Sequence, residues 1–385
     1  MINLAYKDIK HSLSKFLITA ISVGVLLGIV IVMIGVYRGM VFDAKVLVDD
    51  IKADIWVVQQ DTLGPFAQTS KVHEDLKNQI KYQNGIKYAD AITFQTFQME
   101  NKYGDFKVML VGYDPLSKIK IIDKSKLIEG RLLQKQHYEL VVSKKTNYKL
   151  GEKIKLGRDY FTVVGITRDT VSNGGDFLIF SSLKDAQTLQ FTYTNERIRS
   201  DDQRGIKGGN PHLVNAIVAK TLDGYNPKDV ALNIENTTHK KVFTKDEQKT
   251  LLLQKVIKKS SKQIGLFTII LIIVSIIIIA LIIYTMTLEK IKEISIMKLI
   301  GIPNFTISKM IIEETIVLGI LAFISGNGFA HMISGVFPKR IVLLSGDAVS
   351  LFIIILIASV FASLFGIYKV IKTDPAEAIG GWYEK

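Results

Sequence analysis

The stretch Ile264–Met286 reads IGLFTIILIIVSIIIIALIIYTM, and it decides the fold class. It is dominated by isoleucine and leucine and has no charged side chain. A helix needs roughly 20 consecutive apolar residues to cross the ~30 Å hydrocarbon layer of a bilayer. Isoleucine lowers helix propensity in water, but in lipid the backbone groups must be paired inside the segment, which a helix achieves. We therefore predict a membrane-spanning helix over residues 264–288.

Three other long stretches also lack charged side chains: Phe16–Tyr37, Thr315–Pro338 and Ala348–Tyr368. A charge at the bilayer centre costs about 2.5–3.5 kcal/mol, so charge-free runs are typical of spanning helices. The first stretch is too long for a signal-peptide core and has no small-residue cleavage site, so we expect it to be retained. The sequence thus predicts four transmembrane helices, within residues 1–38 (after a short amphipathic start), 264–288, 311–338 and 348–370.

Positive charge is unequal between the short polar segments. The segments predicted to share one side carry Lys7, Lys10, Lys15, Lys290, Lys292, Lys298, Lys309, Lys369, Lys372 and Lys385. The short loop between the third and fourth stretches carries only Lys339 and Arg340. The positive-inside rule then places both termini, the segment 289–310 and the tail 371–385 in the cytoplasm. Residues 39–263 are expected outside, because long domains translocate largely regardless of their charge.

Composition limits the function classes. The formal net charge of +13 fits a basic surface facing anionic lipid headgroups. The sequence shows no motif that joins basic and aromatic residues for nucleic-acid binding, so we expect no nucleic-acid partner. The chain has no cysteine, so its redox compartment cannot be read from its sequence.

The long segment 39–263 has a mixed pattern that predicts an α+β domain. Strands are expected at 54–58, 106–112, 139–143, 153–156, 160–165, 177–180 and 214–219, and helices at 72–82, after 182 and at 227–234. The polar, glycine-rich stretches 172–176 and 195–211 predict mobile loops.

A capping box, Thr244-Lys-Asp-Glu247, predicts a helix start. No proline follows before Leu288, so we expect one nearly continuous helix of about 44 residues, or ~66 Å. The alternative is a break near the serine pair Ser260-Ser261, because serine pairs can kink helices.

Motifs of several enzyme classes are absent from the sequence. It contains no G-x-x-x-x-G-K-[ST] phosphate loop, no H-E-x-x-H and no G-x-S-x-G. The six histidines lack metal-ligand spacing. His331 and the pair Glu313-Glu314 lie near the ends of the third apolar stretch, where ionisable side chains are tolerated, so we expect structural roles for them. We predict no catalytic, cofactor-binding or metal site.

Three segments carry a family resemblance. The N-terminal LAYKDIKHSLSKFLITAISVGVLLGIVIVMIGV resembles the start and first helix of the FtsX-like permeases of ABC transporters, the group that includes MacB, LolC/LolE and DevC. EISIMKLIGIPNFTISKMIIEETIVLGI, from Glu293, is similar to their cytoplasmic signature, and TDPAEAI at Thr373–Ile379 to their close. The resemblance covers the whole chain. GEKIKLGRDYFTVVGI resembles part of the MacB-type periplasmic core, and ADIWVVQQ and FTKDEQ look most like the DevC branch.

The resemblance implies a site. In this family the cytoplasmic signature docks on an ATPase subunit, which assigns ATPase coupling to Glu293, Ile294, Met297, Lys298 and Gly301. A short amphipathic helix ending at Gly301, before Pro303, fits that role. The alternative is a helix that merely lies at the lipid interface.

The resemblance also implies a function. The chain is expected to be the permease subunit of an ABC exporter in the bacterial cytoplasmic membrane, without its own ATPase site, so that ATP is bound by a separate partner subunit. A homodimer or paired permease is expected. The motion would drive efflux of an outer-leaflet or periplasmic substrate, with an adaptor and an outer-membrane channel as further partners. Alternatives are a LolC/LolE-like lipoprotein-releasing permease and an FtsX-like regulator of a cell-wall hydrolase.

Overall fold

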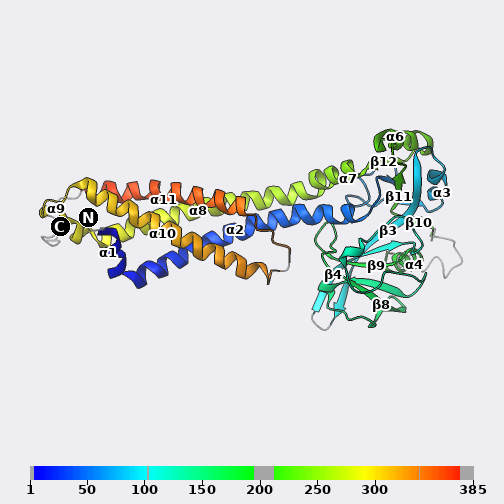
Figure 1. Ribbon diagram of the computed structural model, residues 1–385, viewed down its shortest axis with the longest axis horizontal. Coiled ribbons are helices and arrows are strands. Elements are labelled where there is room, and N and C mark those ends of the chain that lie inside the picture. The colour runs from blue at the N-terminus through cyan, green and yellow to red at the C-terminus, as the bar shows by residue number, and fades with distance from the viewer. Residues whose placement is uncertain (1–3, 102–103, 195–211, 338, 373–385) are drawn as a thin grey trace. The chain divides into compact units, whose positions relative to one another are not determined.

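A computed structural model describes residues 4–101, 104–194, 212–337 and 339–372. The chain divides into two compact units (Figure 1). The helical unit comprises Met1–Gly39 and Ser261–Lys385, and the α+β unit comprises Met40–Ser260. Each unit has buried apolar residues of its own.

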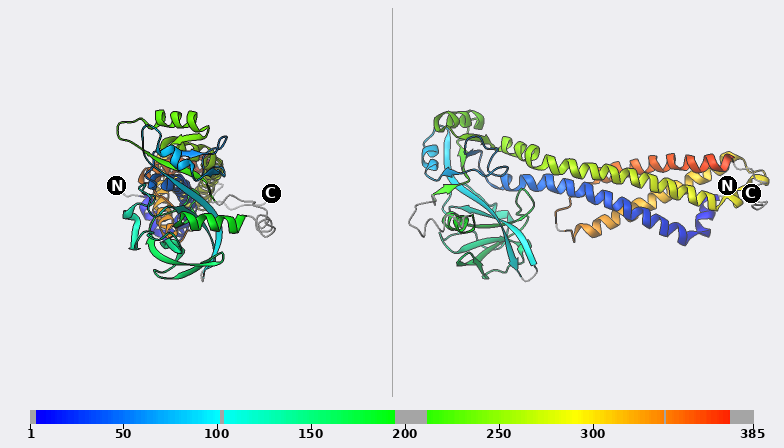
Figure 2. Two further views of the ribbon diagram at one scale, coloured as in Figure 1. Left: turned by 90° about the vertical axis from the view of Figure 1, so that its right-hand side faces the viewer. Right: turned by 180° about the vertical axis from the view of Figure 1, so that it is seen from behind.

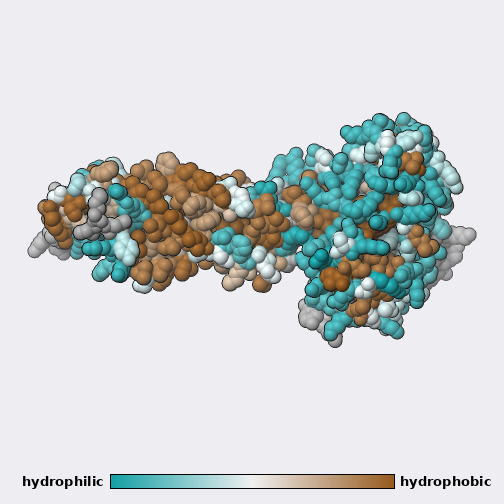
Figure 3. All heavy atoms as spheres, viewed as in Figure 1, coloured by the Kyte–Doolittle hydropathy of each residue, from teal (hydrophilic) through white to brown (hydrophobic). Residues whose placement is uncertain are grey.

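The helical unit is built from long apolar helices. Its elements are α1 (Leu4–His11), α2 (Leu13–Asp50), α8 (Lys258–Glu289), α9 (Ile291–Leu299), α10 (Asn304–Ser334) and α11 (Ser345–Lys372). Apolar residues cover most of the face of this unit that Figure 3 shows, whereas hydrophilic residues dominate the α+β unit. An apolar exterior on a helical bundle is the arrangement that a lipid environment requires.

Three described helices are long and apolar enough to cross a membrane: α2, α8 and α11. The third predicted span falls on α10, a helix of 31 residues that is not among those three. Its apolar stretch includes Asn327 and His331. A fourth transmembrane helix therefore stays a prediction.

Glycines allow the backbones of α2 and α10 to approach closely. A Cβ atom on Gly326 would lie 2.5 Å from the carbonyl oxygen of Gly24 and 3.1 Å from the nitrogen of Gly28. Both are backbone atoms of the neighbouring helix, so no side-chain movement could relieve the clash. In lipid the hydrophobic effect does not drive helices together, so small residues at such crossings stabilise the helix pair by allowing close packing.

The α+β unit contains one mixed sheet of ten strands in the order β12-β1-β11-β3-β4-β9-β6-β8-β5, with β7 paired to β8. The pairs β4–β9 and β6–β8 are parallel, and the others are antiparallel. The strands are β1 (Ile55–Val58), β3 (Ile86–Asn101), β4 (Gly104–Tyr113), β5 (Leu127–Gly130), β6 (Glu139–Ser143), β7 (Lys153–Leu156), β8 (Asp159–Thr167), β9 (Phe177–Ser182), β11 (Ala216–Thr221) and β12 (Lys241–Thr244). A separate small sheet pairs β2 (Val72–His73) with β10 (Leu213–Val214).

Helices α3 (Leu76–Lys81), α4 (Leu183–Thr194) and α6 (Pro227–Thr238) pack on this sheet (Figure 2). Pro227 occupies the first turn of α6, as predicted, and the Asn226 side chain caps it by accepting from the Lys228 backbone N–H. The predicted α+β class of this unit is confirmed.

Three local predictions have different outcomes in the structure. The helix expected from Val72 begins at Leu76, because Val72 pairs instead with Val214 in the small sheet. The stretch 172–176 is a hydrogen-bonded turn, in which the buried Ser172 hydroxyl accepts from the backbone N–H of Gly174 and Asp176, and its mobility stays a prediction. The second predicted loop, 195–211, lies outside the described residues.

Helical structure runs without a gap from Lys245 to Glu289, as the sequence predicted. It consists of α7 (Lys245–Leu251), a π-helical turn at Leu252–Ile257, and α8. The predicted capping box is present, with Thr244 accepting from the Glu247 N–H and Glu247 accepting from the Thr244 N–H. The alternative, a break near Ser260-Ser261, is wrong, because α8 continues through both serines. The irregularity is the π-helical turn, a feature often found at functional positions.

An ion pair inside the α+β unit gives a prediction about pH. Arg131 donates to both carboxylate oxygens of Glu139, at 2.5 and 3.0 Å, and the N–H groups of Gln134 and Lys135 add further bonds. These bonds lower the pKa of Glu139 from 4.5 to about 2. The lowered pKa contributes stability that is present above pH ~4.5 and is lost as the pH falls toward 2.

We expect the Glu139→Gln variant to be less stable than the wild type at pH 6 and to approach it as the pH falls from about 4.5 to 2. Thermal unfolding of both purified proteins across this range is the measurement. A stability difference that stays constant over the range would show that Glu139 keeps an ordinary pKa.

Candidate functional site

The predicted coupling segment forms a short helix with a tightly closed end. After α9, Gly301 adopts a left-handed conformation with φ +92°. Its N–H donates to the Lys298 carbonyl and the Ile302 N–H to the Met297 carbonyl, each at 3.0 Å. This pair of bonds is a Schellman motif, and it favours glycine at the left-handed position. Pro303 then ends the turn, and α10 begins at Asn304.

One face of α9 is buried against the helical unit. Ile294 lies in a cluster with Ile307, Ile311, Ile367 and Val370, and Met297 and Ile302 pack against that cluster. Burying such side chains is worth roughly 1.5–3 kcal/mol each, so this face anchors α9 to α10 and α11.

Lys298 makes a polar anchor beside this cluster. Its Nζ donates to the carbonyl oxygens of Val370, at 2.6 Å, and Ile371, at 3.3 Å. These carbonyls belong to the last turn of α11, where a cation interacts favourably with the helix dipole. Four of the five predicted residues, namely Ile294, Met297, Lys298 and Gly301, therefore hold the segment in place, and Glu293 is exposed.

The opposite side exposes apolar side chains that the sequence reasoning missed. We call Ile296, Leu299, Ile300 and Phe305 the tip patch; all four are exposed. The first three lie at spacings of three and four residues, so they share one face of α9. In the sequence they appear only as apolar residues within the short lysine-containing segment 289–310, between two predicted spanning helices. Clustered exposed apolar residues of this kind mark interaction sites.

Charged side chains connect this segment to two further helices. Lys290 directly precedes α9 and pairs with Asp8 of α1 and with Glu314 of α10, the latter at 3.0 Å. Lys15, near the start of α2, pairs with Glu289 at the end of α8. A displacement of α9 can therefore act on α1 and α10 through Lys290, and the pair Lys15–Glu289 joins α2 to the end of α8 that leads into α9.

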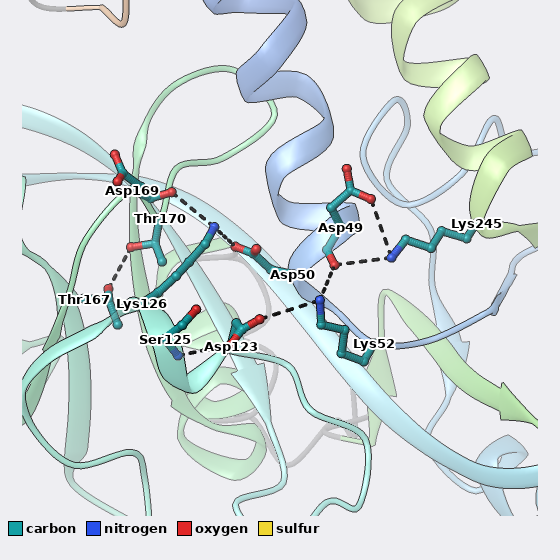
Figure 4. Close-up of polar contacts among 10 residues, drawn as sticks. All are labelled: Asp49, Asp50, Lys52, Asp123, Ser125, Lys126, Thr167, Asp169, Thr170 and Lys245. Carbon is teal, nitrogen blue, oxygen red and sulfur yellow. Dashed lines mark hydrogen bonds and ion pairs between the residues drawn. The ribbon is translucent and has the colours of Figure 1, made fainter.

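The helices α2 and α7 enter adjacent strands of the sheet. The chain passes from α2 into β1 and from β12 into α7, and β1 pairs with β12 in the register Ile55↔Thr244. Asp49 of α2 also pairs with Lys249 of α7, at 2.5 Å, and with Lys245, at 3.6 Å. These ion pairs link the two helices at the point where they lead into the sheet (Figure 4). We call this region, formed by residues 49–52 together with Lys245 and Lys249, the joint.

The joint also makes ion pairs with the turn that leads into β5, the strand at the other end of the sheet from β12. Asp50 accepts from Lys126 at 2.6 Å, and Lys52 pairs with Asp123 at 3.7 Å (Figure 4). Lys126 lies in the short turn Lys124–Lys126 that leads into β5. The end of α2 is therefore connected both to α7 and to the strands around β5.

Two known protein families match separate parts of this chain. Residues 16–237 match the MacB-like periplasmic core domain, and residues 265–375 match the FtsX-like permease C-terminal domain. The chain belongs to the MacB/FtsX family of ABC transporter permeases. The permease thus carries both parts that the resemblance predicted. Residues 289–310, which we call the tip segment, lie within the FtsX-like part, as do α9–α11 and α8 from Gly265 onward.

Curated relatives cover the whole permease. It is 21% identical to an "Uncharacterized ABC transporter permease" of Mycobacterium tuberculosis, over 99% of this chain and 100% of that protein. It is 22% identical to the "Putative hemin transport system permease protein HrtB" of Staphylococcus haemolyticus, over 98% and 99%. Among solved structures, the periplasmic region of MacB from Actinobacillus actinomycetemcomitans is 15% identical, with a TM-score of 0.35, over 53% of this chain and 94% of that one.

Three finer predictions remain untested. None of these relatives bears on the DevC-like assignment. The motif Thr373–Ile379 and most of the predicted tail, 371–385, lie outside the described residues. The role of the five coupling residues also stays a prediction, refined by the division between anchoring residues and the tip patch.

Proposed function

We propose that the chain is the membrane subunit of an ABC exporter whose ATPase is a separate protein, bound at the tip patch. The observation that carries this proposal is the continuity of α2 and of the helical run Lys245–Glu289. α2 leads into β1, the helical run follows the adjacent strand β12, and the run leads directly into the tip segment. At 1.5 Å per residue, the 38 residues of α2 extend about 57 Å. Helices of this length act as stiff levers and not as loose tethers.

The proposed cycle uses these contacts in order. ATP-driven closure of two ATPase subunits shifts the tip segment of each permease copy. Lys298, through its bonds to α11, and Lys290, through its ion pairs with α1 and α10, transmit the shift to the other helices of the helical unit. The helices α2 and α7–α8 then transmit it to the joint around Asp49 and Asp50. Motion of the α+β unit then expels a substrate taken from the outer leaflet or the periplasmic side, with an adaptor and an outer-membrane channel as further partners.

The proposed topology follows from the lysine distribution. Both termini and the tip segment lie in the cytoplasm of a bacterium, where ATP is available, and the α+β unit lies outside the cytoplasmic membrane. Two copies pair through their transmembrane helices.

A hemin-like compound is a candidate substrate, because relatives that align over nearly the whole chain are named as putative hemin permeases. Lipoprotein release and control of a cell-wall hydrolase are the alternatives. Deleting the gene separates them. Sensitivity to hemin supports the first, retained lipoproteins in the cytoplasmic membrane support the second, and undivided cells with normal hemin tolerance support the third.

The joint gives a prediction that tests transmission itself. Lys126→Gln removes the ion pair with Asp50 while keeping a polar side chain. We expect ATP turnover of the reconstituted complex to stay within about twofold and export to fall about tenfold, because the lost link lies downstream of the ATPase. Paired assays of ATP hydrolysis and substrate efflux in proteoliposomes measure both.

Lys124→Gln is the matched control. Lys124 is exposed and lies two positions away in the same turn. It should leave both activities unchanged. Equal losses of export in the two variants would contradict a specific role for the link between Lys126 and Asp50.

A further inference from the structure

The longest strand of the sheet has an edge that its neighbours leave open. β3 pairs with β11 only as far as Ile92, whereas its pairing with β4 continues to Asn101. Within the described ranges, residues 95–101 therefore pair with a strand on one side only. Open strand edges expose unpaired backbone groups to which another strand can pair.

Hydrogen bonds before this stretch show which backbone groups face the open edge. The Ile92 carbonyl accepts from the Asn215 N–H, and the Phe94 N–H donates to the Asn215 side-chain oxygen at 2.7 Å. Both groups point away from β4. Because backbone direction alternates along a strand, Thr96, Gln98 and Glu100 present their N–H and C=O groups to the same side. The Tyr148 hydroxyl donates to the Glu100 carbonyl at 3.4 Å, as this direction requires.

A groove of about 850 Å³ lies along this edge. One wall is β3 from Phe97 to Glu100, and the other is the segment from Asn147 to Leu156, which includes β7. β7 pairs with β8 on one side, and the described residues provide no strand on its other side. The groove thus lies between two strands that each keep an open edge.

The floor and the rim of the groove differ in character. Met99, Ile154 and Leu156 belong to one apolar core, with Phe97 packed against it, so the floor is firm. The rim is more basic than acidic: of the residues that line the groove, the exposed Lys149, Lys153 and Lys155 outnumber the two carboxylates, Glu100 and Glu152. Positive charge beside an open strand edge favours an acidic segment over a basic one.

We propose that this groove binds an extended, acidic polypeptide segment of a partner protein, which adds to the sheet as a strand along Thr96–Glu100. Backbone hydrogen bonds to Thr96 and Gln98 supply the affinity, and the lysines of the 144–155 segment select the charge. This site does not depend on the proposed function, since it uses neither the tip patch nor the joint.

A defined peptide tests the proposal on the full-length chain in detergent micelles. The probe is a capped, fluorescein-labelled peptide, Thr-Glu-Val-Glu-Val-Glu-Thr. We expect a saturable rise in fluorescence anisotropy below about 1 mM. We also expect slower hydrogen exchange of the Thr96, Gln98 and Glu100 amides on binding, because these amides face the open edge and become bonded.

Gln98→Pro removes one N–H from the open edge without breaking a bond to β4, and should weaken binding at least about tenfold. Gln98→Ala, which keeps that N–H, should stay within about twofold. A lysine-for-glutamate peptide should bind at least about tenfold more weakly. If Gln98→Pro unfolds the protein, a backbone N-methylated peptide asks the same question with the wild-type chain and should not bind.

Three results would overturn the proposal. The first is no saturable binding of the acidic peptide up to about 1 mM. The second is equal binding of the acidic and the N-methylated peptides. The third is strong protection of the Thr96, Gln98 and Glu100 amides without any peptide, which would mean that the chain itself or a second copy already covers the edge.

Discussion

Leu299→Glu is expected to abolish binding of the partner ATPase to the permease. Leu299 is 63% exposed and lies between Ile296 and Ile300 in the sequence of the tip patch. A docked ATPase would bury this side chain, and burying a carboxylate without a partner costs several kcal/mol. A loss of about 4 kcal/mol lowers affinity roughly a thousandfold. Co-purification and titration of the ATPase against the permease measure this loss.

The α+β unit offers a matched control. Leu232 is 61% exposed on α6, so Leu232→Glu makes the same change at nearly the same exposure. It should leave ATPase binding unchanged. Glu293→Ala tests the exposed residue of the original coupling set, and we expect it to weaken binding moderately, because a rim charge contributes less than a buried apolar anchor. Wild-type binding by Leu299→Glu would show that the ATPase docks elsewhere.

Gly326→Val is expected to disrupt the helical unit. Its Cβ would lie 2.5 Å from the Gly24 carbonyl oxygen, and valine adds two further methyl groups. The helices α2 and α10 would have to separate, which loses packing along the whole crossing. Overpacking typically costs 1–3 kcal/mol, and a clash with backbone belongs at or above the upper end of about 3 kcal/mol. We expect the thermal unfolding temperature in detergent to fall by about 5 °C or more.

Gly328→Val is the control for this change. Gly328 lies two residues further along α10, and a Cβ there would meet nothing within 4 Å. We expect an unchanged or slightly higher unfolding temperature, since glycine inside a helix is unfavourable. A similar fall for both variants would mean that valine disturbs α10 itself and that the crossing with α2 is not critical.

Local sequence signals predicted much of this fold for identifiable reasons. The charge-free runs predicted the long helices, because insertion into lipid depends on local composition. The Thr244–Glu247 capping box and Pro227 predicted helix starts, since both act through neighbouring backbone groups. The strands β6 and β7 were predicted at their observed bounds.

Non-local structure was harder to predict. The longest strand, β3, was missed, because its sequence, IKYADAITFQTFQMEN, mixes small, polar and aromatic residues without clean alternation. Its two faces contribute to different cores: Ile92 and Phe94 lie in one, and Met99 in another. A strand used in this way shows no single amphipathic period. Tertiary contacts decide such an element, and one sequence alone does not reveal them.

The roles of individual coupling residues were also not predictable from the sequence alone. The family signature selected Glu293, Ile294, Met297, Lys298 and Gly301 as one set. The structure gives four of them anchoring roles within the chain and exposes Ile296, Leu299, Ile300 and Phe305 beside them. The motif therefore predicted the segment, whereas only the packing of α9 on α10 and α11 shows which of its side chains remain free for a partner.

The central claim is that the tip segment and the α+β unit lie on opposite sides of the membrane. The chain has no native cysteine, so single cysteines can report the side. Tyr82, 85% exposed, marks the α+β unit, and Phe305, 80% exposed, marks the tip patch. In spheroplasts treated with a membrane-impermeant maleimide, the account predicts that Tyr82→Cys is labelled at once and that Phe305→Cys is labelled only after lysis. Labelling of Tyr82→Cys only after lysis would contradict it.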